Sequence, residues 1–105
     1  MKKREKVLIT RNLPGDGIDL IRRDYDLLIE PLESPMSRKQ LLELIPEADA
    51  LICLLSEKID REVLERANNL KVISNYAVGY NNIDVELATE KGIYVTNTPD
   101  VLTEA

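Results

Sequence analysis

The sequence predicts an α/β fold, in which helices pack on both faces of one parallel β-sheet. Two observations lead to this prediction. Five short apolar runs recur along the chain with little polar alternation, which is typical of parallel strands buried on both sides. The segments between these runs carry the start and stop signals of helices. A chain of 105 residues suits a single domain, which we place at residues 1–105.

The five predicted strands leave room for a helix in each gap between them. They are Lys6–Thr10, Tyr25–Glu30, Ala48–Leu55, Lys71–Tyr76 and Gly92–Asn97. Five strands in a chain of this length suit the flavodoxin-like order 2-1-3-4-5, because the classical dinucleotide-binding fold needs six strands and more residues. We therefore predict a three-layer αβα sandwich with right-handed crossovers.

The firmest helix start lies near the middle of the chain. Ser37 is placed as an N-cap and Gln40 occupies the third helical position, which together make a capping box. Met36 and Leu41 have the spacing of a hydrophobic staple across the same turn. A helix is therefore predicted to begin directly after Ser37.

Two later helices have acidic N-caps. Asp60 precedes "REVLER" and Asp84 precedes "VELATE", and Gly92 can end the second of these helices in the left-handed conformation. The remaining helix, predicted within residues 17–25, has the weakest start signal because two glycines flank its start and it is short.

Composition excludes several classes of function. The net charge of −5 comes from 14 basic and 19 acidic residues scattered along the chain, and only 4% of residues are aromatic, so a nucleic-acid partner is not expected. No apolar run approaches the ~18 residues of a membrane-spanning helix, so a membrane partner is not expected either. The opening basic residues precede an apolar run too short for a secretion signal, and the single cysteine, Cys53, suits a small buried hydrophobe. We expect a cytoplasmic protein.

Ligands of such sheets bind beyond the carboxyl ends of the strands, near the switch in strand order. This rule selects three loops, "RNLPGDG", "LLSEKI" and "AVGYNN". The first loop lacks the GxGxxG spacing that approaches a pyrophosphate, and the first two lack the acidic pair of a phospho-receiver domain. The second loop is either a substrate contact or a plain strand end that leads into an N-cap.

The third loop belongs to the stretch "NYAVGYNNID", residues 75–84, a polar turn after a predicted buried strand. Ala77, Val78 and Gly79 can turn consecutive backbone N–H groups outward, and such a concave row binds an anion such as a carboxylate. The alternative is that Gly79 merely makes the turn. The residues alone leave both interpretations open.

The stretch "VISNYAVGYNNIDVELATEKGIYVTNTPDVLTEA" resembles the D-isomer-specific 2-hydroxyacid dehydrogenases, in particular their glyoxylate and hydroxypyruvate reductase branch. The resemblance implies that the backbone N–H groups of Val78 and Gly79 hold the substrate carboxylate. It also implies that the loop Leu54–Ser56 closes over the substrate and that Thr103 approaches the nicotinamide cofactor. Asn81 departs from the family, which usually has an aspartate there, and this puts fine substrate specificity in doubt.

The resemblance also implies what the chain lacks. Hydride transfer in this family needs a Rossmann domain that holds NAD(P), and a histidine as acid and base, but these 105 residues contain no histidine and no GxGxxG. We therefore expect residues 1–105 to be a substrate-binding domain that stops at the hinge helix. Such a domain would bind a small 2-oxo or 2-hydroxy acid and no cofactor of its own, would hold no catalytic residue or metal ligand, and would be inactive alone.

The complete enzymes of the family also cover this domain with a helix from their C-terminus. Without that helix an apolar face should lie bare, so we expect a homodimer or a domain-swapped pair. The alternative from another class is a free-standing anion-binding or protein-interaction module without redox activity.

Overall fold

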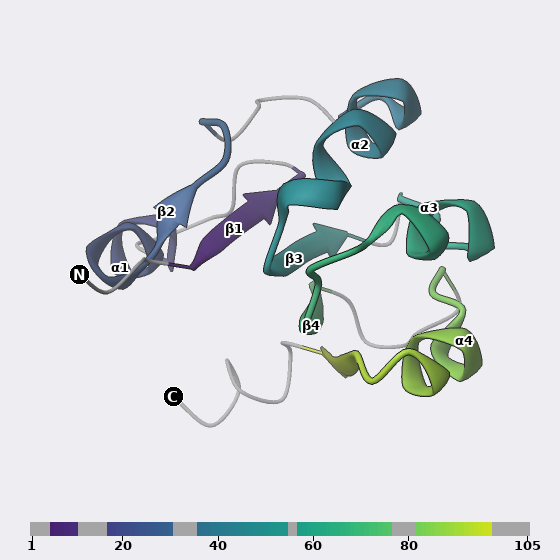
Figure 1. The fold of residues 1–105 in the computed structure, drawn as a ribbon. Helices are drawn as coiled ribbons and strands as arrows, with labels where there is room; N and C mark the ends of the chain where they lie inside the picture. The colour runs from purple at the N-terminus through teal and green to yellow at the C-terminus, as the bar shows by residue number, and fades with distance from the viewer. Residues whose placement is uncertain (1–4, 11–16, 31–35, 55–56, 77–81, 98–105) are drawn as a thin grey trace.

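A five-stranded parallel sheet forms the centre of the molecule (Figure 1). The computed structural model describes residues 5–10, 17–30, 36–54, 57–76 and 82–97. The strand order is β2-β1-β3-β4-β5, which confirms the predicted order and the α/β class. The strands are β1 (Lys6–Ile9), β2 (Asp26–Leu27), β3 (Ala50–Leu54), β4 (Val72–Tyr76) and β5 (Tyr94–Asn97).

Within these described residues, five helical segments lie between the strands. They are α1 (Gly17–Asp24), α2 (Arg38–Leu44), the 3₁₀ turn η1 (Ile45–Glu47), α3 (Arg61–Arg66) and α4 (Val85–Glu90). None of the helices in these described parts of the chain is both long and apolar enough to cross a membrane.

The predicted N-caps are confirmed. The Ser37 hydroxyl accepts a hydrogen bond from the Gln40 N–H at 3.2 Å, which satisfies one of the unpaired donors in the first turn of α2. The side chains of Asp60 and Asp84 accept in the same way from the third residue of α3 and of α4. Each acidic cap also lies at the positive end of its helix dipole.

The end of α4 has the hydrogen bonds of a Schellman motif. The Ile93 N–H donates to the Ala88 carbonyl at 2.8 Å, and the Gly92 N–H donates to the Thr89 carbonyl at 3.0 Å. Gly92 has φ +79°, a left-handed conformation that residues with a Cβ rarely adopt. Because Gly92 belongs to this motif, β5 begins at Tyr94 and is shorter than the predicted strand.

The second strand is also shorter than predicted, with two residues in place of 25–30. As an edge strand β2 pairs only with β1, and one more hydrogen bond, of 3.0 Å, runs from the Leu28 N–H to the Val7 carbonyl. Leu28 and Ile29 pack against the main hydrophobic core. The apolar character of this run therefore reflects burial of its side chains more than strand pairing.

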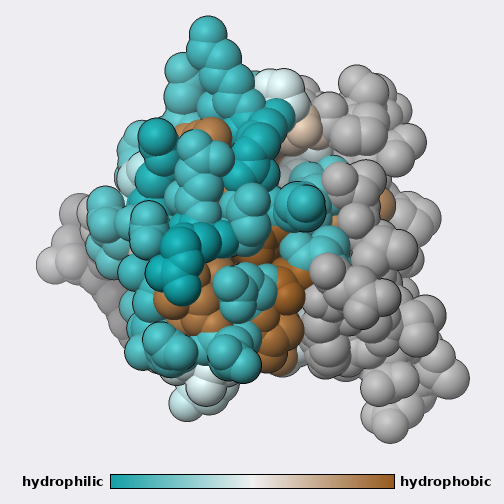
Figure 2. All heavy atoms as spheres, turned by 90° about the vertical axis from the view of Figure 1, so that its right-hand side faces the viewer, coloured by the Kyte–Doolittle hydropathy of each residue, from teal (hydrophilic) through white to brown (hydrophobic). Residues whose placement is uncertain are grey.

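The two faces of the sheet are covered unequally. The main core contains Leu8, Leu51 and Ile73 from the sheet and is closed by residues of α2, η1, α3 and α4. A smaller cluster on the opposite face contains Val7, Ile9 and Ile18, and α1 is the described helix that packs there. The side of the molecule that carries α2, α3 and α4 is largely hydrophilic, with an apolar area in its lower half (Figure 2).

Coverage of the α1 face falls from β1 to the edge strand β5. One row of residues that pair across the sheet runs Val7, Ala50, Val72, Tyr94. The first of these side chains is 4% exposed and the last is 77% exposed. Among the described residues, the β4–β5 half of this face is therefore the least covered part of the sheet.

Candidate functional site

Polar side chains converge where β1, β3 and β4 end. Within the described residues, the buried polar or charged side chains are Thr10, Glu57 and Asn75. They come from three segments far apart in the sequence, which the parallel sheet brings to one edge because parallel strands end on the same side. This carboxyl edge of the sheet is where α/β proteins bind ligands.

Glu57 ties the end of β1 to the loop after β3. Its Oε1 atom accepts a hydrogen bond of 2.6 Å from the Thr10 hydroxyl and one of 2.9 Å from the Leu54 N–H. The Glu57 N–H donates in turn to the Leu54 carbonyl at 3.1 Å. Hydrogen bonds to a carboxylate are stronger than neutral ones, so this buried carboxylate fixes both ends of the short connection between residues 54 and 57.

Asn82 joins that loop to the segment after β4. Its Nδ2 atom donates to the Leu54 carbonyl at 3.1 Å and to the Glu57 carbonyl at 2.9 Å. The Asn75 Nδ2 donates to the Asn82 Oδ1 at 2.9 Å, and a longer contact of 3.3 Å runs from the Asn82 Nδ2 to the Asn75 Oδ1. The two asparagines therefore join the end of β4 to the segment that begins at residue 82.

The backbone adds a second link between the same two segments. The Ile59 N–H donates to the Asn82 carbonyl at 2.7 Å, and the Asp84 N–H donates to the Ile59 carbonyl at 2.9 Å. Ile59 and Ile83 form an isolated parallel bridge outside the sheet. The loop after β3 and the segment after β4 are thus paired as an extension of the β3–β4 ladder.

Cys53 lies beneath this network and is a buried, free thiol. Burial raises its pKa to about 12, with a smaller contribution from the charge of Glu57. The protonated Sγ donates a weak hydrogen bond of 3.5 Å to the Asn75 Oδ1. The prediction of a small buried hydrophobe is confirmed, and the thiol is not an activated nucleophile.

Of the four residues predicted to form the site, the structure describes one. Leu54 lies at the carboxyl end of β3, half-buried, and both its N–H and its carbonyl take part in the network. Val78, Gly79 and Thr103 lie outside the described residues, as do Ser56 and Asn81. Their assignments remain predictions.

Sequence reasoning missed four residues that build this edge, Thr10, Glu57, Asn75 and Asn82. The available signal was position: each is a polar residue at the end of a predicted strand, or in the loops that follow. What the sequence did not reveal is that these side chains bond to one another. Among the described residues, no group of three histidine, cysteine or acidic side chains is placed to hold a metal ion.

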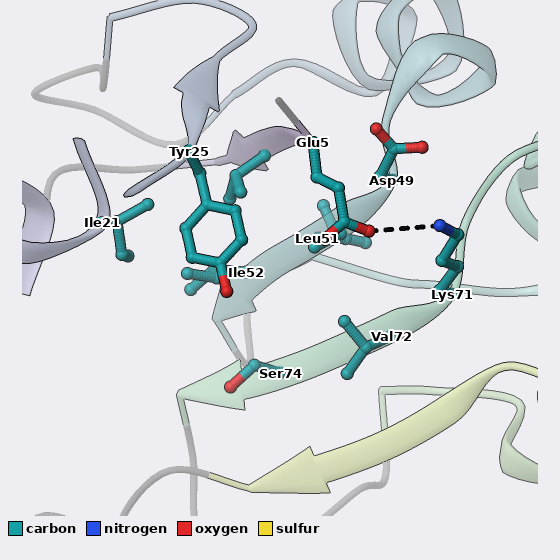
Figure 3. Close-up of a pocket in the computed structure, with 11 residues that line it drawn as sticks. Glu5, Ile21, Tyr25, Asp49, Leu51, Ile52, Lys71, Val72 and Ser74 are labelled. Atoms are coloured by element: carbon teal, nitrogen blue, oxygen red, sulfur yellow. Dashed lines mark hydrogen bonds and ion pairs between the residues drawn. The ribbon is translucent and has the colours of Figure 1, made fainter. Parts of the chain in front are cut away.

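A hollow of about 250 Å³ opens on the α1 face, away from this edge (Figure 3). Ile21, Tyr25 and strand residues such as Ile52 and Val72 form its walls. At the amino ends of the strands, an ion pair of 3.1 Å between Lys71 and Glu5 lies at its rim. Its lining is largely apolar apart from polar groups such as the Tyr25 and Ser74 hydroxyls and the rim ion pair, and because ligands of such sheets bind beyond the carboxyl ends of the strands, we place the ligand site at the carboxyl edge.

Comparison with known proteins gives the family of the chain. Residues 7–105 match the family model described as D-isomer specific 2-hydroxyacid dehydrogenase, catalytic domain. The chain is 53% identical over 100 residues to a glyoxylate reductase of Thermococcus gammatolerans, an alignment that covers 95% of this chain and 30% of the relative.

Solved structures show the same fold. A crystal structure of a Pyrococcus horikoshii protein has a TM-score of 0.84 at 38% identity, and the match covers 97% of this chain and 30% of that one. The NAD+-bound 3-phosphoglycerate dehydrogenase of Entamoeba histolytica has a TM-score of 0.76 at 25% identity, covering 92% of this chain and 33% of that one. The chain thus spans about a third of the length of these proteins, and the resemblance found in the sequence is confirmed: the chain belongs to the D-isomer specific 2-hydroxyacid dehydrogenase family.

Proposed function

We propose that residues 1–105 are the substrate-binding lobe of an NAD(P)-dependent reductase of the glyoxylate and hydroxypyruvate type. The complete enzyme would reduce a 2-oxo acid to a 2-hydroxy acid. The observation that carries this proposal is the pairing of Asn75 with Asn82, the residues on either side of the stretch predicted to bind the carboxylate, at the carboxyl edge of the sheet. The level of identity to glyoxylate reductases supports the choice of substrate class.

Each part of the lobe would have a separate task. The backbone N–H groups of Val78 and Gly79 would hold the substrate carboxylate, and the apolar side chain of Leu54 would exclude water from one side of the substrate. Thr103 would lie near the nicotinamide, which supplies the hydride when it is bound. The 105 residues contain no histidine, so we assign to them binding and orientation of the substrate, not proton transfer.

A homodimer or a domain-swapped pair is part of the same proposal. The support for it is the exposed half of the α1 face, where Tyr94 is 77% exposed beside the half-buried Val72 and Ser74. Covering apolar surface is worth about 25 cal/mol per Å², so a second copy would gain from packing there. The buried free thiol of Cys53 is compatible with the reducing cytoplasm, which we propose as the compartment.

A chimera tests the function directly. This chain replaces the 100 matched residues of the Thermococcus gammatolerans glyoxylate reductase, and the initial rate of NAD(P)H oxidation is measured with glyoxylate and with hydroxypyruvate. We expect an active chimera with a KM for glyoxylate within about tenfold of the relative's, and no activity from the 105-residue chain alone. A folded chimera that binds NAD(P)H but reduces neither acid would contradict the proposal and would favour an anion-binding module without redox activity.

A glycine variant then tests the turn. Gly79→Val in the chimera should raise the KM for glyoxylate at least about tenfold, because a β-branched residue disturbs both the turn and an N–H group that faces the anion. Gly92→Asn is the matched control, since asparagine tolerates a left-handed backbone and an added Cβ at Gly92 meets no atom within 4 Å. Equal KM values for the two variants would leave Gly79 as a simple turn residue.

A further inference from the structure

Tyr94 is the most exposed large hydrophobic side chain that the structure describes, at 77%. It begins β5 and shares a row with Val72 of β4 and Ala50 of β3, so its side chain leaves the sheet on the α1 face, as theirs do. Tyr94 is not among the described residues that line the hollow on that face. An aromatic ring and an apolar hollow therefore lie on the same face of one copy, and neither covers the other.

The hollow is large enough for such a ring. It has a volume of about 250 Å³ and lies on the α1 face over β3 (Figure 3). Ala50 and Ile52 of β3 line it, between Val7 of β1 and Val72 of β4, and Tyr25 lines it at the end of α1. A cavity of about 150 Å³ can hold benzene, so this hollow has room for the side chain of one tyrosine.

The strand order allows two copies to exchange their Tyr94 rings. A two-fold axis that runs along β4, between two facing sheets, would place β5 of each copy over β3 of the other, because β3 and β5 are the two neighbours of β4. Tyr94 of each copy would then lie opposite Ala50 of the other, since both residues belong to one row. The two contacts would be identical, as a symmetric dimer requires.

The same arrangement leaves space for α1. This helix packs on the part of the face formed by β1, through Ile18 against Val7 and Ile9. Because β5 is the last strand in the order, the sheet of the second copy would end over β3 and would not extend over β1. The α1 helix of each copy would therefore lie beside the sheet of the other copy instead of colliding with it.

The charges around the hollow suit an uncharged ring. Glu5 and Lys71 at the rim are ion-paired at 3.1 Å, and Asp49 accepts a hydrogen bond of 2.8 Å from the Lys6 N–H. A charged side chain would lose its water on entering the largely apolar hollow, whereas Tyr94 brings no charge. Its hydroxyl group could donate to a rim carboxylate such as that of Glu5, as buried tyrosines usually need a partner.

The area also reaches what a specific dimer needs. An inserted tyrosine buries about 150–250 Å² of its own surface, and the walls that receive it lose a similar area. Two insertions would therefore bury about 600–1,000 Å² in all. Contacts between the remaining side chains of the two facing sheets would bring the total toward the roughly 1,200–2,000 Å² of specific interfaces.

We propose that a second copy of this chain covers the α1 face, with Tyr94 of each copy inserted into the hollow of the other. The arrangement rests on the dimer of the proposed function and specifies its anchor, the site that receives the anchor, and its symmetry. It requires neither the carboxylate site nor hydride transfer. A domain-swapped pair and a monomer whose hollow takes another molecule are the alternatives that the experiment distinguishes.

The experiment measures the dimer dissociation constant of the 105-residue chain and its variants by sedimentation equilibrium. Tyr94→Ser removes the anchor, and Ala50→Phe fills the hollow from within the same chain. Val72→Phe fills it from the next strand and replaces Ala50→Phe if circular dichroism shows that variant to be unfolded. The control is Val85→Ser, which removes an exposed apolar side chain at the start of α4, on the opposite face of the sheet.

We expect Tyr94→Ser and Ala50→Phe each to raise the dissociation constant at least about hundredfold, because each variant dimer loses both insertions and a central aromatic anchor contributes about tenfold or more. An equimolar mixture of the two variants should associate about tenfold more tightly than either alone. In the mixed dimer, Tyr94 of the Ala50→Phe chain can still enter the open hollow of the Tyr94→Ser chain. Val85→Ser should associate as the unaltered chain does.

The possible results separate the alternatives. A dimer whose dissociation constant is unchanged by Tyr94→Ser would overturn the insertion and would favour a domain-swapped pair, and a mixture no tighter than its components would overturn it as well. An unaltered chain that stays monomeric at every concentration would overturn both the insertion and the proposed dimer. None of these results changes the activity expected of the chimera, so a failure of the insertion is distinguishable from a failure of the proposed substrate-binding function.

Discussion

Replacing Thr10 with valine removes one hydroxyl from the buried network and leaves the shape of the side chain nearly unchanged. The Thr10 Oγ1 donates a 2.6 Å hydrogen bond to the Glu57 Oε1, and the two side chains are 0% and 5% exposed. The backbone bond from the Thr10 N–H to the Ile52 carbonyl, at 3.1 Å, does not involve the side chain. The substitution therefore tests one bond between the end of β1 and the loop after β3.

The magnitude follows from two opposing terms. A hydrogen bond to a charged group contributes about 1.5–3 kcal/mol to stability. The methyl group that replaces the hydroxyl recovers up to about 0.8 kcal/mol through burial of apolar surface. We expect Thr10→Val to lower the free energy of unfolding by about 1–2 kcal/mol, and the melting temperature by roughly 5–15 °C for a domain of this size.

Urea unfolding followed by far-ultraviolet circular dichroism measures the change. The urea concentration at the midpoint of unfolding should fall. The slope of the unfolding free energy against urea concentration should stay constant, since the surface exposed on unfolding is the same. The matched control is Thr96→Val on β5, where the side chain is exposed and the free energy of unfolding should change by less than about 0.5 kcal/mol. A loss below about 0.5 kcal/mol in Thr10→Val would refute the reasoning, because the Thr10–Glu57 bond would then contribute nothing measurable.

Three further predictions concern single groups. Because burial raises the pKa of the Cys53 thiol to about 12, this thiol should react with Ellman's reagent at pH 8 only as fast as the chain unfolds; rapid labelling of the native chain would contradict its burial. The hydrogen bond from Arg38, at 2.7 Å, lowers the pKa of Asp60, so the stability from this exposed pair is present above about pH 4 and is lost as the pH falls through the lowered pKa. Arg38→Met should therefore reduce the free energy of unfolding that is lost on acidification, by less than about 1 kcal/mol. An unchanged dependence of stability on pH would count against the pair. Tyr94→Lys, on the exposed half of the α1 face, should weaken the self-association that sedimentation equilibrium measures. If the unaltered chain is a monomer at every concentration, the proposed dimer is wrong.

The fold was predictable because its signals are local. Ser37, Asp60 and Asp84 cap helices through side chains that bond to backbone only three residues away, and Gly92 ends α4 through its own dihedral angle. Apolar runs gave the number of strands, and the length of the chain limited their order. The strand ends were less accurate, as in the short β2, because an apolar run marks burial and does not separate pairing in a sheet from packing in the core.

The candidate site was only partly predictable. The rule that ligands bind beyond the carboxyl ends of parallel strands gave its edge of the sheet, and Leu54 lies there. The contacts that build this edge join Thr10 to Glu57 and Asn75 to Asn82. Thr10 and Glu57 are 47 residues apart in the sequence. Thr10 and Glu57 meet only because β1 and β3 are neighbours in the sheet, and Asn75 and Asn82 stand on either side of residues 77–81, so no local pattern in the sequence distinguishes these four from ordinary polar loop residues.

The sequence by itself determined which helices and strands form, the parallel sheet and the family, since caps, apolar runs and the "VGYNNID" motif are all properties of short stretches. Only the tertiary structure decided which polar groups are buried and what satisfies them. A buried carboxylate or amide must find a partner within hydrogen-bond reach, and that partner is set by the register of neighbouring strands. The register of β3 against β4 places Cys53 opposite Asn75, and the network that joins the loop after β3 to the segment after β4 begins at that pair.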